Sequence, residues 1–200
     1  MTEKTLNSGN YKCRILVQVG EGLPVIFLHG SSYTSEVWRN IGVTTLLKEK
    51  HVPFLALDMP YGLNTECQPK TNDVKANVEV VREAVRTTFS SSTPMVVGAS
   101  LGGHVALMYA AQFPVQGLLL VSPTRVFHET LLEAYAKFAF PVRIVWGSED
   151  TIVSGEDMRN LAAKLPQAKL ITYEGAGHSA YRYQPDRFKR DLLALYAAAQ

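Results

Sequence analysis

Short apolar runs recur along the chain and alternate with longer stretches that mix apolar and polar residues. Most runs are continuous and lack a polar residue at every second position, which is typical of strands buried on both faces of a parallel sheet. The runs predict strands at Val25–Leu28, Phe54–Leu57, Met95–Val97, Leu118–Val121, Val142–Trp146 and Ala168–Tyr173. Upstream of them, Lys12–Val19 is suited to an antiparallel edge strand.

The stretches between the runs carry apolar residues three and four positions apart, which indicates helices with one buried face. Val74, Val78 and Val81 share such a face. The predicted helices are Asp73–Phe89, Leu101–Gln112, Glu129–Phe138, Gly155–Leu165 and Asp186–Ala199. This alternation predicts an α/β fold with a mostly parallel central sheet flanked by helices. The serine-rich segment 90–93 is expected to be a turn, not a domain boundary.

The composition fits a globular protein. The chain has 200 residues, of which 46% are hydrophobic and 19% are charged, close to the average for globular domains. We therefore expect residues 1–200 to form a single domain. The 20 Lys and Arg residues nearly balance the 18 Asp and Glu residues. The net charge thus does not favour nucleic acid or an anionic membrane surface as a partner.

The cysteines and the N-terminal segment bear on the compartment. Cys13 and Cys67 are far apart in sequence and form no metal-binding or redox motif. We expect both to be free thiols, as in a reducing compartment. Residues 1–10 lack the apolar core of a signal peptide, and no apolar run reaches the ~18 residues of a membrane span. These features predict a cytoplasmic protein without a membrane partner.

One short motif points to a specific chemistry. Ligands of a parallel α/β sheet bind beyond the carboxyl ends of its strands, and Gly98-Ala99-Ser100-Leu101-Gly102 follows the predicted strand Met95–Val97 at that edge. The segment fits the G-x-S-x-G nucleophile elbow, a strained turn that projects the serine oxygen over the sheet. Small flanking residues allow so tight a turn. Ser100 is therefore the predicted nucleophile, and a glycine-rich turn without chemistry is the alternative.

A serine nucleophile needs a base. The chain has five histidines, at positions 29, 51, 104, 128 and 178. His178 lies just past the last predicted strand, at the same sheet edge as Ser100, whereas His104 lies on the helix after Ser100 and is expected to point along it. His178 is therefore the predicted base.

The base needs a carboxylate that orients it. Asp150 follows the predicted strand Val142–Trp146, and we expect the turn there to direct it inward, with Glu149 as the competing acid. The chain order Ser100, Asp150, His178 is the order of α/β-hydrolase triads.

The oxyanion hole requires two backbone N–H donors. One is expected to be Leu101, the residue after the nucleophile. The other is expected from Ser31, in the loop after the strand Val25–Leu28, where Gly30 permits close backbone approach.

As a set, these motifs resemble the α/β-hydrolase superfamily over essentially the whole chain. The matching segments are Phe27–Ser31, Leu57–Asp58, Gly98–Gly103, Trp146–Asp150 and Gly175–His178. Within the superfamily, the His-Gly loop followed by Ser35-Glu36-Val37-Trp38 is most similar to the small, lidless CIB-type hydrolases. The resemblance implies the α/β-hydrolase fold with no lid or a minimal one.

The substrate pocket is expected to be open and shallow. Only about twenty residues separate Val121 from Val142, room for one helix rather than a helical lid. The loop after Asp58 departs from the pattern of many relatives, and Tyr61 is expected to reach the pocket. The predicted pocket walls lie near loop ends: Ser32, Tyr33, Tyr61, Val126, Ile152 and Tyr181.

These features predict a serine hydrolase of carboxylesterase type that cleaves small, short-acyl esters through an acyl-enzyme. No metal and no cofactor is expected, because the sequence carries no metal-binding or nucleotide-binding motif. Thioester hydrolysis and acyl transfer use the same triad and remain alternatives. Perhydrolase or lyase chemistry is a weaker alternative. A binding or scaffold protein on a hydrolase fold is the non-enzymatic alternative.

Overall fold

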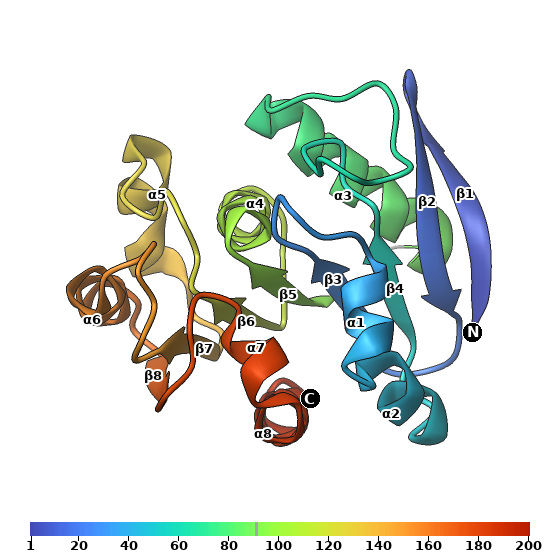
Figure 1. Ribbon diagram of the computed structural model, residues 1–200. Coiled ribbons are helices and arrows are strands. Elements are labelled where there is room, and N and C mark those ends of the chain that lie inside the picture. The colour runs from blue at the N-terminus through green and yellow to red at the C-terminus, as the bar shows by residue number, and fades with distance from the viewer. Residues whose placement is uncertain (91) are drawn as a thin grey trace.

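The computed structural model describes residues 1–90 and 92–200. Its strands form one eight-stranded sheet in the order β1-β2-β4-β3-β5-β6-β7-β8 (Figure 1). The strands are β1 (Thr2–Ser8), β2 (Tyr11–Gln18), β3 (Val25–Leu28), β4 (Phe54–Leu57), β5 (Met95–Ala99), β6 (Gly117–Val121), β7 (Val142–Gly147) and β8 (Ala168–Tyr173). From β4 to β8 all neighbours are parallel, whereas β1 and β2 are antiparallel additions. The predicted mostly parallel sheet is confirmed.

Helices cover both faces of this sheet. They are α1 (Glu36–Asn40), α2 (Val43–Glu49), α3 (Val74–Phe89), α4 (Leu101–Ala110), α5 (Glu129–Ala134), α6 (Gly155–Lys164), α7 (Ala180–Tyr183) and α8 (Pro185–Ala198), with a 3-10 turn at Tyr135–Lys137. Residues of α3 to α6 belong to one apolar core and residues of α1, α2, α7 and α8 to a second, on the opposite face (Figure 1). Successive residues of a strand point alternately into the two cores. In β3, Ile26 and Leu28 belong to the first core, and Val25 and Phe27 belong to the second.

All six strands predicted from apolar runs are present, but the sheet ends differently from expectation. The predicted edge strand, here β2, has a strand on either side, and β1 forms the edge. The sequence did not reveal β1 because only Leu6 and Ser8 are buried in it, so it has no apolar run. The turn predicted at 90–93 includes Ser91, which lies outside the described residues.

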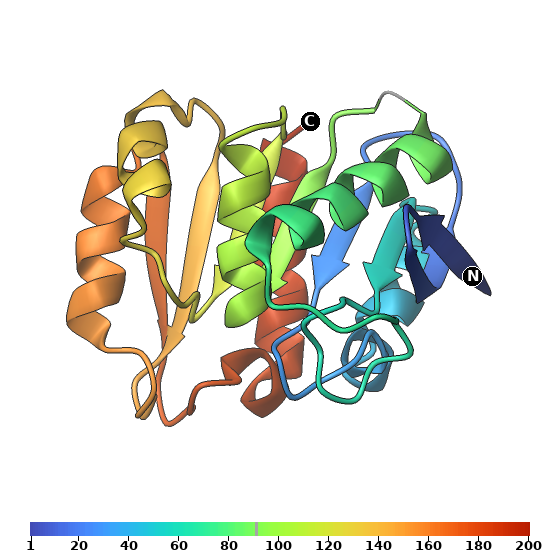
Figure 2. The same ribbon diagram turned by 90° about the horizontal axis from the view of Figure 1, so that it is seen from above.

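Between β6 and β7 the chain forms only α5 and the 3-10 turn, so no separate lid is built there. Figure 2 shows the loops after β3 and β4 at the same end of the sheet. They are hydrogen-bonded directly, from the Leu63 N–H to the Ser31 carbonyl at 2.9 Å. No helix in residues 1–90 and 92–200 has the length and apolar character needed to cross a membrane.

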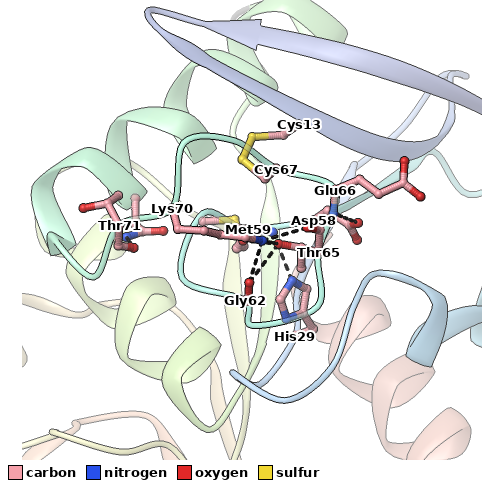
Figure 3. The surroundings of a disulfide bond; sticks show 11 residues. Cys13, His29, Asp58, Met59, Gly62, Thr65, Glu66, Cys67, Lys70 and Thr71 are labelled. Atoms are coloured by element: carbon pink, nitrogen blue, oxygen red, sulfur yellow. Dashed lines mark hydrogen bonds between the residues drawn. A yellow bond between two sulfur atoms is a disulfide. The ribbon is translucent and has the colours of Figure 1, made fainter.

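The expectation of two free thiols is wrong: Cys13 and Cys67 form a disulfide (Figure 3). The spacing of the two cysteines in the sequence does not predict this bond. It depends on how the segment around Gln68 pairs with β2. Lys12 and Gln68 exchange backbone hydrogen bonds of 2.8 and 3.0 Å, which places the next residue of β2 beside the residue before Gln68. Both cysteines are buried. The cysteines therefore do not indicate a reducing compartment.

Candidate active site

Ser100 sits at the turn between β5 and α4 with φ 53° and ψ −116°. A positive φ is uncommon outside glycine and marks local backbone strain. Two glycines make the turn possible. A Cβ at Gly98 would collide with the backbone of Gly102 and Gly103, and one at Gly102 would collide with the carbonyl groups at the end of β3. The sharp turn depends on this close packing, as the nucleophile-elbow motif requires.

Three side chains from separate loops meet at this turn. Nε2 of His178 lies 2.9 Å from the Ser100 hydroxyl oxygen. Nδ1 of His178 lies 2.9 and 3.1 Å from the two carboxylate oxygens of Asp150. An ionised carboxylate only accepts hydrogen bonds, so Nδ1 carries the proton and Nε2 accepts the proton of the serine hydroxyl. The arrangement can activate Ser100 as a nucleophile.

The Asp150 carboxylate is held ionised by its surroundings. Its side chain is fully buried, and burial alone would raise its pKa. The backbone N–H of Val153, the Ser122 hydroxyl, the Ile152 N–H and His178 outweigh that effect and lower the Asp150 pKa below its usual range. The two N–H donors lie 3.0 and 2.9 Å from Oδ1.

The structure separates Asp150 from the competing acid. Glu149 is exposed, and its backbone N–H donates to the Ala176 carbonyl at 2.9 Å. Its side chain makes no hydrogen bond or ion pair to His178 within the described chain.

The two predicted oxyanion donors, Ser31 and Leu101, both belong to segments beside Ser100. Ser31 lines the same cavity as Ser100 and His178, and Leu101 is the first residue of α4. Among residues 1–90 and 92–200, neither N–H donates to a backbone carbonyl. Both are therefore free for an oxyanion. Gly30 allows the loop to approach, because a Cβ there would lie 3.4 Å from Ser100 Cβ.

The cavity over the triad has a volume of about 180 Å³. Four predicted wall residues line it: Ser32, Tyr33, Ile152 and Tyr181. Tyr181 is 1% exposed and stacks on Trp38 with ring centroids 5.0 Å apart, so most of its surface belongs to the core. The hydroxyl of Tyr33 lies 3.2 Å from that of Ser179 and accepts a hydrogen bond from Arg182 at 2.7 Å.

A second, larger cavity of about 380 Å³ lies between the β6–α5 loop and the start of α6. Its apolar walls include Val126, Phe127 and Met158, and Arg125 and His128 also line it. Ile152 belongs to the walls of both cavities. The predicted wall residue Val126 is therefore placed in this second cavity and not over the triad.

The expectation that Tyr61 reaches the pocket is wrong. Tyr61 is 4% exposed and does not line the triad cavity. Its hydroxyl donates to the His29 carbonyl at 2.5 Å, and its ring packs against the His29 ring at 5.3 Å. Burial of the hydroxyl raises the pKa of Tyr61 well above its ordinary value. Tyr61 therefore belongs to the interior next to the segment after β3. Its hydroxyl satisfies the buried carbonyl of His29, which needs a donor.

Two buried polar residues, Asp58 and His29, support the site, and the sequence alone predicted no role for them. Asp58 follows β4 and accepts a hydrogen bond from the backbone N–H of Glu66 at 3.0 Å (Figure 3). It also accepts one from the backbone N–H of Ser35 at 2.7 Å. His29 follows β3 and is fully buried. Their positions could have indicated this role, because both residues come directly after a strand at the ligand-binding edge of the sheet.

The histidine on α4 takes no part in the triad. His104 is 3% exposed, and its ring centroid lies 6.1 Å from that of His128. Burial, with lesser effects from Arg125 and His128, lowers the pKa of His104 to about 4. No group of three or more His, Cys, Asp or Glu side chains in the described ranges is placed to hold a metal ion.

Comparison with known proteins shows the family of this chain. The model of the alpha/beta hydrolase family matches residues 25–143, more than half of the chain. The chain belongs to the alpha/beta hydrolase family. The predicted membership and fold class are thereby confirmed. In three dimensions the chain is similar to a predicted CIB-like hydrolase from Thermoplasma acidophilum, with a TM-score of 0.85, 23% identity and 96% of each chain covered.

The chain is also similar to two curated proteins over most of its own length. "Protein ABHD14A" from Homo sapiens is 28% identical over 173 residues, which are 86% of this chain and 63% of the relative. "Putative protein-lysine deacylase ABHD14B" from Rattus norvegicus is 28% identical over 172 residues, 84% of this chain and 80% of the relative. The chain thus spans less than two thirds of the length of the human relative.

Proposed function

We propose that this alpha/beta hydrolase is a serine hydrolase that cleaves small acyl esters through a covalent acyl-enzyme. The observation that carries the proposal is the continuous hydrogen-bonded chain from the Ser100 hydroxyl through His178 to Asp150. In that geometry the base and the orienting carboxylate can activate the serine for attack on an acyl carbon.

The reaction follows from the roles of these groups. Ser100 Oγ attacks the acyl carbon while Nε2 of His178 takes the hydroxyl proton. The carbonyl oxygen becomes negative and accepts hydrogen bonds from the N–H groups of Ser31 and Leu101. The tetrahedral intermediate then breaks its bond to the alcohol, which leaves with the proton from His178. Water, activated by the same imidazole, hydrolyses the acyl-enzyme and returns Ser100 to its hydroxyl form.

The cavity over the triad favours a small acyl group. Its volume of about 180 Å³ is below the range of about 300–1,000 Å³ for cavities that bury drug-sized ligands. The second cavity, which shares Ile152, offers apolar space for a larger portion of the same substrate. We expect acetyl and butyryl esters to be better substrates than octanoyl esters.

Deacylation of an acyl-lysine amide is a second candidate. It is favoured by the similarity to the rat relative, whose name refers to protein-lysine deacylation. The same triad serves this reaction, because His178 can protonate a leaving amine as it protonates a leaving alcohol. Thioester hydrolysis and acyl transfer to another acceptor place the same demands on Ser100.

Initial rates of the wild type and of Ser100→Ala test the proposal. The substrates are p-nitrophenyl acetate, butyrate and octanoate, an acetyl-lysine peptide and an acetyl thioester. Ser92→Ala is the matched control, because Ser92 is an exposed serine whose hydroxyl donates to the Phe89 carbonyl at 2.8 Å. We expect turnover and labelling by a fluorophosphonate in the wild type and in Ser92→Ala, and neither in Ser100→Ala.

The pattern of outcomes separates the candidates. Turnover of esters that falls with chain length supports a short-acyl esterase. Turnover of the peptide or the thioester alone moves the assignment to that substrate class. A wild type that is neither active nor labelled at Ser100 would overturn the enzyme proposal and leave a scaffold protein.

A further inference from the structure

His29 is a buried polar side chain that the proposed reaction does not use directly. Its Nδ1 lies 2.7 Å from the Gly30 carbonyl oxygen, and its Nε2 lies 3.0 Å from the Met59 backbone nitrogen (Figure 3). A carbonyl only accepts and a backbone N–H only donates, so the ring proton sits on Nδ1. Burial lowers the pKa of His29 to about 4, which keeps the ring neutral near pH 7.

The hydrogen bond from Nδ1 fixes the orientation of the next peptide group together with the Tyr33 N–H, which donates to the same Gly30 carbonyl at 3.0 Å. In a trans peptide the C=O and N–H vectors point in opposite directions. Because the Gly30 carbonyl is held toward His29, the N–H of Ser31 is directed away from that ring. Gly30 packs against Ser100, and both Gly30 and Ser31 line the triad cavity.

The loop after β4 holds the same segment through further hydrogen bonds. The Tyr61 hydroxyl donates to the His29 carbonyl at 2.5 Å, and the Leu63 N–H donates to the Ser31 carbonyl at 2.9 Å. The Met59 N–H anchors the imidazole itself. Through its two ring nitrogens, His29 couples Met59 in the loop after β4 to the peptide that carries the predicted oxyanion donor.

We propose that His29, with its proton on Nδ1, is a positioning residue that directs the Ser31 N–H toward the oxyanion of the transition state. His29 is fully buried and is not part of the wall of the triad cavity, so it acts through Gly30 and not on the substrate. The inference rests on the proposed serine hydrolase function. Loss of one oxyanion donor lowers kcat by about 10²- to 10³-fold, which sets the scale of the expected effect.

Two substitutions separate the two hydrogen bonds of the ring. His29→Asn places an amide nitrogen at the position of Nδ1, where it can still donate to the Gly30 carbonyl. His29→Gln places its polar atoms near the position of Nε2, where they can still accept from Met59 but no longer hold Gly30. Each variant retains one of the two ring hydrogen bonds. A merely structural role would therefore lower their rates and their thermal stabilities to similar extents.

The measurements are kcat and KM for p-nitrophenyl acetate, the rate of fluorophosphonate labelling at Ser100 and the thermal unfolding midpoint. We expect kcat of His29→Asn to stay within about tenfold of wild type, and kcat of His29→Gln to fall about 100-fold. KM should change less than about threefold in both, because the donor acts on the transition state. Phosphonate labelling should slow in His29→Gln in parallel with kcat.

Any of the following results would overturn the inference. Equal kcat in the two variants would assign His29 a structural role only, and a larger loss in His29→Asn would place the important contact at Met59. A rise in KM at unchanged kcat would place the effect on substrate binding. If the wild type is neither active nor labelled, the proposed function fails and this inference fails with it. An active, labelled wild type matched by His29→Gln removes this inference alone.

Discussion

Oδ2 of Asp150 lies 2.9 Å from Nδ1 of His178, and this bond aims the opposite ring nitrogen at Ser100. The Asp150 side chain is fully buried and that of His178 is 18% exposed. The carboxylate therefore holds the proton on Nδ1 and leaves Nε2 to accept the serine proton. Catalysis should depend on the charge of residue 150 as well as on its ability to form a hydrogen bond.

Asp150→Asn should lower kcat for a short-chain ester on the order of 10⁴-fold, because an amide can stabilise the wrong imidazole tautomer and carries no charge. Steady-state kinetics with p-nitrophenyl acetate measure the effect. Glu149→Gln is the matched control, since Glu149 is the exposed neighbouring acid. A large loss in Glu149→Gln with little loss in Asp150→Asn would contradict the assignment.

The stability of the fold should fall in acid because His29 is buried without a charge. Its pKa is lowered from 6.5 to about 4 in the folded protein, so between these values the unfolded chain binds a proton that the folded chain does not. This titration therefore leaves the free energy of unfolding unchanged above about pH 6.5. As the pH falls from there toward 4, it lowers the free energy of unfolding by on the order of 3 kcal/mol.

Urea unfolding at pH 7, 5.5 and 4 checks this expectation. His29→Asn should lose less unfolding free energy than the wild type between pH 7 and pH 4, because it lacks the titrating ring. His51→Asn is the control: His51 is exposed, and its φ of 54° is one that asparagine tolerates. An acid dependence in His29→Asn equal to that of wild type would contradict the prediction.

The central sheet could be predicted from sequence because its strands are buried on both faces. Val25–Leu28 and Phe54–Leu57 are wholly apolar, and all of their residues are buried. The relative placement of Ser100, Asp150 and His178 followed from a second regularity. Residues directly after parallel strands gather at one edge of the sheet, whatever their distance along the chain.

Features that depend on register or side-chain direction were not predictable in this way. β1 has mostly exposed side chains, so its sequence carries no burial pattern. The disulfide depends on the pairing of Lys12 with Gln68, which no local pattern encodes. Tyr61 stands in the expected loop, but the position of an aromatic near a pocket does not decide whether it faces the pocket or supports the loop beneath it.

The Cys13–Cys67 disulfide should contribute to stability mainly by restricting the unfolded chain. It closes a loop with a sequence separation of 54 residues, for which the chain-entropy relation gives about 4 kcal/mol as an ideal value. The oxidised protein should therefore unfold at a higher urea concentration than the reduced protein. The Cys13→Ser, Cys67→Ser double variant should match the reduced protein and not respond to dithiothreitol. Identical unfolding curves with and without reductant in the wild type would contradict this role.

The chain-length preference should depend on Ile152, because this side chain is a wall of both cavities. Ile152 is 67% exposed, so a larger side chain there should not disturb the core. Ile152→Trp should fill space at the residue that the two cavities share and lower kcat/KM for the octanoate ester by at least about tenfold, since each methylene excluded from an apolar pocket is worth about 1–3 kcal/mol. The acetate ester should be hydrolysed at nearly the wild-type rate, because an acetyl group fits over the triad alone.

The ratio of kcat/KM for octanoate and acetate is the decisive quantity, since it cancels changes in the amount of active enzyme. Val19→Trp is the control, because Val19 is similarly exposed at 64% and lies outside both cavities. An equal loss on both esters in Ile152→Trp would show that the residue affects the triad and not the acyl length. An unchanged ratio at unchanged rates would show that substrates do not enter the second cavity past Ile152.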